Sequence, residues 1–162
     1  MCSVLLLAAA ISAAPSFAAE HRTATVWWRG VQEFGAAKIE NSMSAAVRQP
    51  GKAGEVTMPA IFLHPNDEGR ATATFPPLRM GVAAGLRAFF VGYVSLSDGI
   101  KWDDKENVAD GARFYVTVDG KDVLSAEAKE TKWFPVAAEL YEAPAGNGTF
   151  EATVALATDS GP

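Results

Sequence analysis

The stretch Asp110–Asp159 is the part of the sequence that most constrains the fold. Its residues are DGARFYVTVDGKDVLSAEAKETKWFPVAAELYEAPAGNGTFEATVALATD. Apolar and polar side chains alternate from Phe114 to Val118, as they do in a half-buried strand. Asp119-Gly120 follows, and an Asp-Gly pair favours the tight hairpin turn in which both central residues need positive φ. The stretch therefore predicts consecutive antiparallel strands with almost no helix.

The rest of the chain also carries short β-rich runs separated by turns. Pro59 would confine its strand to a sheet edge or a bulge. The segment Glu40–Gly54, which holds Asn, Ser, Pro and Gly, predicts a loop, and Val31–Ile39 fits a short helix or irregular chain. Further strands are expected at Thr23–Arg29, Glu55–Leu63, Arg70–Phe75, Gly85–Leu96, Val123–Ala126, Lys132–Tyr141 and Phe150–Leu156. About seven or eight short strands without a βαβ rhythm indicate an all-β, two-layer antiparallel β-sandwich, with a jelly roll or another Greek-key connection.

The strand expected at Gly85–Leu96 is apolar on both faces. Its even-numbered residues from Leu86 to Leu96 share one face, and Phe89, Val91 and Tyr93 lie on the other. Such a strand is either central and covered, or it presents an aromatic surface. We expect it to be covered.

The first residues resemble a secretory leader. An apolar run from Val4 to Ala14 is followed by Pro15 and by small residues up to Ala19, as in an h-region with its cleavage zone. No Lys or Arg precedes the run, so either the free amino terminus supplies the positive charge of the n-region, or the true start lies upstream. We expect a signal peptide at 1–19, an N-terminal strand and loop region at 20–54, and the sandwich core at 55–162.

This leader predicts a secreted or periplasmic protein. The single cysteine, Cys2, lies before the apolar run, so the mature protein would have none and would depend on its core rather than on disulfides. The net charge of −5 argues against nucleic acid and against anionic lipid as partners. No later segment predicts a membrane span.

The sequence offers little for catalysis. Its histidines are His21, beside the expected cleavage site, and His64, which precedes a proline. No Gly-x-Ser-x-Gly elbow, P-loop or Gly-x-Gly-x-x-Gly motif occurs. Carboxylates are frequent, and their densest group lies in one loop, whereas a glycosidase needs a pair that flanks its substrate. We expect no enzymatic activity, and a small hydrolase is the alternative.

The loop Ser97–Gly111 is rich in oxygen ligands. Asp98, Asp104 and Asp110 are candidate calcium ligands, because Ca²⁺ prefers carboxylate oxygens. The order of Asp, Asn and Gly does not match an EF-hand, and no Glu closes the loop. A solvated loop with Asp-Gly turns is the interpretation we favour. Structural calcium is the alternative, and we expect no other cofactor.

Aromatic residues in polar surroundings are the candidates for a sugar site. Trp102 lies in the acidic loop beside Asp103 and Asp104, with Asn107 following. The ring could stack on the apolar face of a sugar while the polar side chains bind its hydroxyls. Packing of Trp102 over the base of the loop explains the residue equally well.

Four segments carry a resemblance to a known family. The chain resembles carbohydrate-binding-like modules attached to glycoside hydrolases in the runs FLHP at Phe62–Pro65, GLRAFFVGYVSLSDG from Gly85, DGARFYVTVDGKDV from Asp110 and VALATDSGP from Val154. The closest type is the NPCBM-like, galactose-binding-like jelly roll, and the resemblance covers Ile61–Pro162. The matching motifs are structural turns rather than ligand signatures.

The resemblance implies a non-catalytic module that binds a polysaccharide or glycan. In that interpretation Trp102 stacks on a sugar ring, Tyr93 or Trp133 supplies a second aromatic surface, and Asp103, Asp104 and Asn107 bind hydroxyls. The resembling modules continue into a final strand beyond the position of Pro162. We therefore expect the sandwich to lack its last strand, and the chain to be part of a longer polypeptide or to pair with a partner. A structural or interaction domain without a small ligand is the second hypothesis.

Overall fold

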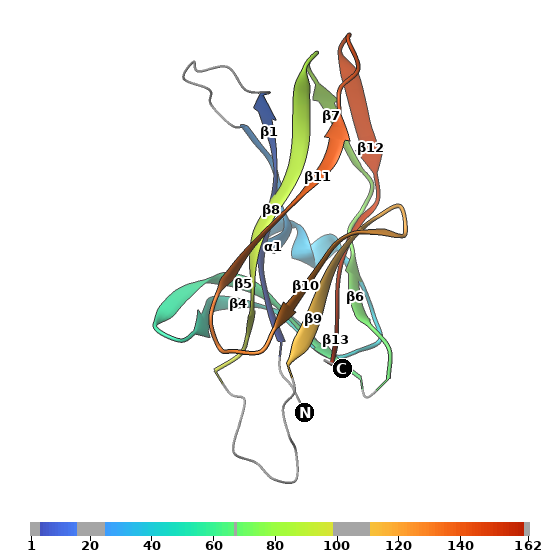
Figure 1. Cartoon of the computed structure of the whole chain (residues 1–162). Coiled ribbons are helices and arrows are strands. Elements are labelled where there is room, and N and C mark those ends of the chain that lie inside the picture. Colours follow the sequence, from blue (N-terminus) through green and yellow to red (C-terminus); the bar gives the residue numbers. More distant parts are fainter. Residues whose placement is uncertain (1–3, 16–24, 67, 99–110, 161–162) are drawn as a thin grey trace.

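The computed structural model describes residues 4–15, 25–66, 68–98 and 111–160, with the backbone alone for residues 4–15, 25 and 27. The protein is built from antiparallel strands in three sheets (Figure 1). The largest sheet has the order β11-β8-β1-β5-β4, and β2 pairs with β1. Its strands are β1 (Val4–Pro15), β2 (Thr25–Arg29), β4 (Ser42–Ala53), β5 (Val56–Pro65), β8 (Leu86–Leu96) and β11 (Phe134–Glu142).

The second sheet has the order β10-β9-β13-β6-β3, and a two-stranded sheet joins β12 to β7. These strands are β3 (Lys38–Glu40), β6 (Ala71–Thr74), β7 (Leu78–Val82), β9 (Ala112–Val118), β10 (Lys121–Ala128), β12 (Gly148–Ala152) and β13 (Val154–Ser160). The only helical turns in the described residues are α1 (Gly30–Glu33) and η1 (Phe34–Ala36). The predicted all-β, antiparallel sandwich class is confirmed, whereas the jelly-roll connection stays a prediction.

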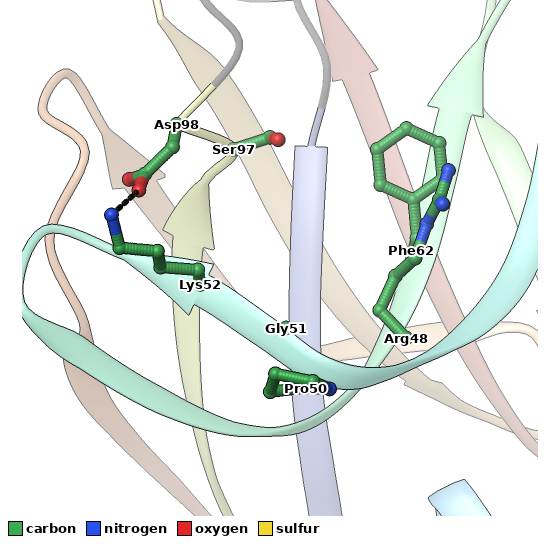
Figure 2. A pocket seen from close by; sticks show the side chains of 7 residues that line it. All are labelled: Arg48, Pro50, Gly51, Lys52, Phe62, Ser97 and Asp98. Carbon is green, nitrogen blue, oxygen red and sulfur yellow. Dashed lines mark ion pairs between the residues drawn. The ribbon is translucent and has the colours of Figure 1, made fainter.

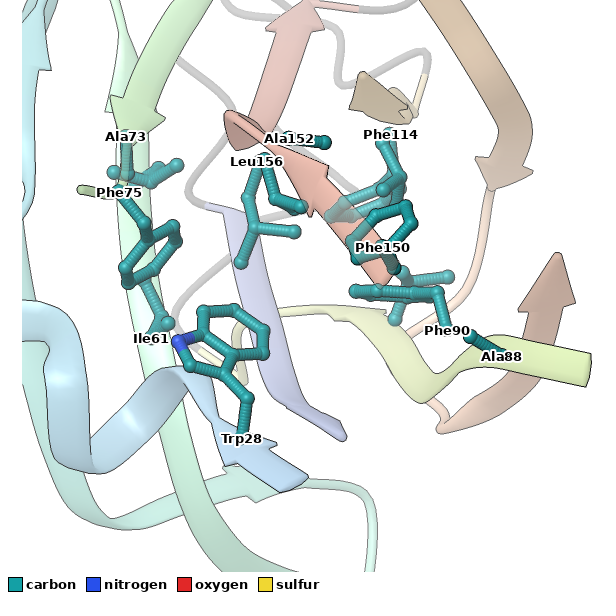
Figure 3. Packing of buried hydrophobic residues seen from close by; sticks show 14 of the residues in the cluster. Trp28, Ile61, Ala73, Phe75, Ala88, Phe90, Phe114, Phe150, Ala152 and Leu156 are labelled. Atoms are coloured by element: carbon teal, nitrogen blue, oxygen red, sulfur yellow. The ribbon is translucent and has the colours of Figure 1, made fainter. Parts of the chain in front are cut away.

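The core fills the space between the two larger sheets (Figure 3). Phe90 from β8 and Phe114 from β9 are fully buried, and each comes from a different sheet. Trp28 packs edge-on against Phe75, with ring centroids 4.7 Å apart and planes at 87°. Aromatic pairs favour this geometry because the positive ring edge meets the negative ring face. The packing of aromatic rings therefore ties the two layers together.

The Asp119-Gly120 turn forms as the sequence predicts. Its φ angles are 49° at Asp119 and 78° at Gly120, so both central residues have the positive φ of a type I′ turn. The turn sets the register of β9 and β10, in which Val118 pairs with Lys121. The Asp119 carboxylate also accepts a hydrogen bond of 2.8 Å from the Thr153 backbone N–H, which fixes the turn against β13.

Strand β8 lies in the middle of the largest sheet, but one of its faces is not covered. Phe90 and Val94 point into the core, as the alternation predicts. On the opposite face Val91 is 36% exposed and Tyr93 is 44% exposed. The expectation that both faces are covered is therefore wrong. The second sheet covers one face of this sheet, and the outer face presents apolar side chains to solvent.

The segment Glu40–Gly54 is mostly strand, so the predicted loop is wrong. Strand β4 occupies Ser42–Ala53 and pairs with β5. The pairing shifts register between Arg48 and Gly51, opposite Pro59. A bulge at this point accommodates Pro50 on β4 and Pro59 on β5. The prediction that Pro59 lies at an edge or bulge is confirmed. Tertiary pairing thus overrides the turn-forming composition of the segment.

The apolar run of the expected leader forms a strand in the structure. β1 pairs with β8 on one side and with β5 and then β2 on the other. An apolar sequence suits both an h-region and a strand that is buried on both faces. The assignment of 1–19 as a cleaved leader stays a prediction. The pairing of β1 described here is that of the chain with residues 1–19 still attached.

Candidate functional site

A pocket of about 320 Å³ opens where β4, β5 and the residues after β8 meet (Figure 2). Its floor and walls combine cations, a carboxylate, a hydroxyl and one aromatic ring. The lining residues are Arg48, Pro50, Gly51, Lys52, Phe62, Ser97 and Asp98. The pocket is therefore polar, open to solvent and chemically mixed.

The bulge in β4 shapes one wall of the pocket. Arg48 pairs with Ala60 and Gly51 pairs with Met58, so residues 49 and 50 have no partner on β5. The bulged chain turns away from the ladder here and carries Pro50 and Gly51 into the lining. Arg48 reaches over the Phe62 ring, with its guanidinium carbon 4.9 Å from the ring centroid. A cation–π contact holds this side chain in place.

Asp98 links the pocket's two sides. Its carboxylate lies 3.0 Å from the Lys52 ammonium and accepts a 2.9 Å hydrogen bond from the Gly54 backbone N–H. Asp98 follows β8, whereas Lys52 and Gly54 belong to the β4–β5 hairpin. By contrast, Arg48 makes no ion pair with any carboxylate in the described part of the chain. Within the described residues, the pocket thus offers one cation paired with a carboxylate, Lys52, and one without such a partner, Arg48.

Most of the sequence-predicted sugar residues fall outside the described residues. Trp102, Asp103, Asp104 and Asn107 all do so. Tyr93 lies on the outer face of β8, opposite Pro135 of β11. Trp133 packs against the cluster of Ala60 and Phe62, and its indole N–H donates a 3.0 Å hydrogen bond to the Val56 carbonyl. Trp133 is two residues from Pro135, the partner of Tyr93 on β11, so the two aromatic residues lie in the same region of the sheet, but no ring contact joins them.

The calcium prediction can be followed only at Asp98. Asp104 and Asp110 lie outside the described residues. The Asp98 carboxylate is engaged by Lys52 and Gly54. No group of three His, Cys, Asp or Glu side chains converges among the residues that the structure describes.

A second polar cluster covers the outer face of the other sheet. The Arg70 guanidinium lies 3.5 Å from the Tyr115 ring centroid and bonds both Asp122 oxygens, at 2.9 and 3.0 Å. The Asp159 carboxylate accepts hydrogen bonds from the Tyr115 hydroxyl at 2.9 Å and from Arg113 Nε at 3.1 Å. Each charge in the cluster has a partner. The arrangement therefore joins β9, β10 and β13 to Arg70, the residue before β6, rather than offering a free site.

The pKa values of this cluster follow from its geometry. Burial and the hydrogen bond to Asp159 raise the pKa of the Tyr115 hydroxyl above its ordinary value. The hydrogen bond and charge of Asp159 raise the pKa of Arg113. Both groups are held in the protonation state that they have at neutral pH.

Sequence reasoning missed Arg48, Lys52 and Phe62 as a site. Arg48 and Lys52 lay in an expected loop, and Lys52 is far from Asp98 along the chain. Only the pairing of β4 with β5 brings them beside the end of β8. The cationic pair within the segment, R-Q-P-G-K, was the one available signal.

Comparisons with family models, curated proteins and solved structures gave no match. In the described residues no helix has the length and apolarity needed to cross a membrane.

Proposed function

We propose that the chain is a non-catalytic carbohydrate-binding module of an exported protein, and that it binds a sugar in the pocket. The observation that carries the proposal is the mixed lining. Arg48 and Lys52 donate hydrogen bonds, and Asp98 and Ser97 supply acceptors. A sugar hydroxyl both donates and accepts, so it needs this combination.

Arg48 pairs with no carboxylate among the described residues, and this free guanidinium favours acidic sugars. A guanidinium binds a carboxylate through two parallel hydrogen bonds, which a neutral sugar cannot offer. We expect uronic-acid-containing glycans to bind more tightly than neutral ones, and added salt to weaken their binding.

The lining also supports a binding role over catalysis. Asp98 is the one carboxylate among the lining residues that the structure describes, and Lys52 neutralises it. Hydrolysis of a glycosidic bond needs two carboxylates placed on either side of the bond. The pocket as described holds one.

A glycan array tests the proposal. The wild-type protein is compared with Arg48→Gln and Lys52→Gln, and Arg79→Gln serves as the matched control because Arg79 pairs with Glu151 far from the pocket. We expect acidic glycans to bind, and Arg48→Gln to weaken binding about tenfold or more, the usual effect of losing a charged hydrogen bond. Equal binding by Arg48→Gln and Arg79→Gln would refute the site.

Trp102 belongs to the same proposal as the stacking residue of the adjoining loop. If Trp102→Ala leaves binding to every glycan on the array unchanged, its assignment is wrong. The array therefore tests the pocket and the loop separately.

A second candidate function is an interaction domain without a small ligand. The exposed side chains of Val91 and Tyr93 on the outer face of β8 favour it, because apolar side chains in the middle of a sheet suit contact with another protein. Failure of the wild-type protein to bind any glycan, together with no melting shift in their presence, would favour this function.

A further inference from the structure

The apolar segment that predicts a cleaved leader fills a central position in the largest sheet. β1 pairs with β8 from Val4–Leu96 to Pro15–Leu86, with one irregularity between Leu7 and Ala10. On its other side Val4 to Leu7 pair with Leu63 to Ala60 of β5. Removing 1–19 would take out a strand that three neighbours share.

The strands on either side of β1 are also held by contacts that do not involve it. Asp98, which follows β8, bonds Lys52 at 3.0 Å and the Gly54 N–H at 2.9 Å, both in the β4–β5 hairpin. Trp133, which precedes β11, donates a 3.0 Å hydrogen bond to the Val56 carbonyl at the start of β5. These links bridge the two halves of the sheet. Because they do not involve β1, they favour β5 and β8 keeping their positions when β1 is removed. The space that β1 then leaves between these two strands is here called the slot.

On the core face, the side chains that flank this slot are apolar. Ile61 and Leu63 of β5, and Val94 and Leu96 of β8, are buried in the core cluster. With β1 absent, the facing N–H and C=O groups of β5 and β8 would lack partners in the middle of a sheet. Backbone groups in such a place need hydrogen bonds, and a strand edge with free groups recruits another strand.

We propose that the slot between β5 and β8 is a strand-acceptor site for a partner polypeptide, and that Val4–Pro15 fills it only until the leader is removed. The occupant is an extended apolar segment that runs antiparallel to both β5 and β8. The sequence VLLLAAAISAAP shows the chemistry that the slot accepts: no charge and mostly aliphatic or small side chains. Main-chain hydrogen bonds supply the affinity in this mode of recognition, and the apolar walls supply the selectivity.

The inference rests on removal of the leader, and it is separate from sugar binding in the pocket. Figure 2 shows β1, in pale violet, passing between the segment with Asp98 and the strand with Phe62. Loss of Arg48 should impair sugar binding and leave strand uptake unchanged. The two proposals can therefore fail independently.

The test uses the full chain with a protease recognition sequence inserted between Ala19 and Glu20. The chain is folded, cut and incubated with a fluorescent peptide of sequence VLLLAAAISAAP that carries a solubilising lysine tail. Fluorescence polarisation and native mass spectrometry then report uptake. The controls are the uncut chain, a scrambled peptide, and a peptide with Leu6→Pro, which lacks an N–H that the ladder needs.

We expect the cut chain to take up one peptide and release the original leader, and the uncut chain and both control peptides to show no uptake. If cutting unfolds the chain, the added peptide should restore its far-ultraviolet circular dichroism, and failure to do so overturns the proposal. A cut chain that has released its leader, stays folded and takes up no peptide also overturns it, because β5 and β8 would then have closed on each other. So does a cut chain that keeps its own leader, because the slot is then never available to a partner. So does a mass spectrum of the exported protein that still contains 1–19.

Discussion

Replacing Asp159 tests whether the polar cluster on the second sheet holds the fold together. Its carboxylate is 16% exposed and accepts hydrogen bonds from the Tyr115 hydroxyl at 2.9 Å and from Arg113 Nε at 3.1 Å. Asp159→Ala removes both bonds, and Asp159→Asn keeps an acceptor for Tyr115 while removing the charge. The two variants therefore separate the hydrogen bond from the ion pair.

The expected magnitudes follow from the exposure of each partner. The hydrogen bond from buried Tyr115 contributes about 1 kcal/mol. The pair with Arg113, whose side chain is 43% exposed, is screened by solvent and contributes about 0.2–1 kcal/mol. Asp159→Ala should then lower the free energy of unfolding by about 1–2 kcal/mol, and Asp159→Asn by less than about 1 kcal/mol. For a domain of this size 2 kcal/mol corresponds to a Tm decrease of roughly 4–8 °C.

Urea unfolding followed by tryptophan fluorescence measures these differences. Glu151→Ala is the matched control, because Glu151 and its partner Arg79 are both largely exposed. We expect it to cost less than about 0.5 kcal/mol. The reasoning is refuted if Asp159→Ala is no more destabilising than Glu151→Ala, or if Asp159→Asn costs as much as Asp159→Ala. Glycan binding should be unaffected by all three variants.

Four further outcomes are expected. Phe90→Ala, at a fully buried position, should lower the free energy of unfolding by about 3–5 kcal/mol in urea titrations, whereas a cost below about 1 kcal/mol would contradict the described core. Gly120→Ala should lower the free energy of unfolding in the same titrations by about 1–2 kcal/mol, because an alanine is strained at a φ of 78°. An added Cβ would meet no atom within 4 Å, so backbone strain is the whole of the expected effect. The pKa of Tyr115 is raised above 10.0, so its contribution to stability is complete below about pH 10 and is lost as the pH rises through the folded-state pKa; Tyr115→Phe should flatten this part of a pH–stability curve. EDTA should leave the Tm unchanged, since the Asp98 carboxylate is already held by Lys52 and Gly54, and a Tm decrease restored by calcium would reverse the interpretation of the acidic loop.

Local patterns in the sequence predict those elements whose signal is local. The Asp119-Gly120 turn is an example, since positive φ is a property of those two residues. The alternation from Phe114 to Val118 also predicts that Phe114, Val116 and Val118 face the core, because adjacent strand residues point to opposite faces. It does not predict that Tyr115, on the other face, is buried too, beneath Arg70.

Elements that depend on tertiary pairing were not predictable in this way. Strand β4 has the composition of a loop, and only its pairing with β5 and the bulge at Pro50 make it a strand. β7 follows two prolines and contains Gly81, so it gives no local strand signal; its partner is β12. The pocket could not be predicted for the same reason, because its cations lie on β4 and its carboxylate follows β8, and only tertiary pairing brings them together.

The apolar run Val4–Pro15 illustrates an ambiguity of a different kind. An uncharged apolar run near the start of a chain predicts a leader. The same composition also suits a central strand, which is how the run pairs in the structure. Removal or retention of 1–19 in the exported protein decides between the two, and the mass of that protein measures it directly.

The most direct test of sugar binding is a titration followed by amide chemical shifts. An acidic glycan selected on the array is added to the protein labelled with ¹⁵N. The account predicts saturable shifts at the backbone amides that line the pocket, those of Gly51, Lys52 and Asp98, and their loss in Arg48→Gln. Shifts confined to the outer face of the second sheet, around Arg113 and Tyr115, would contradict it.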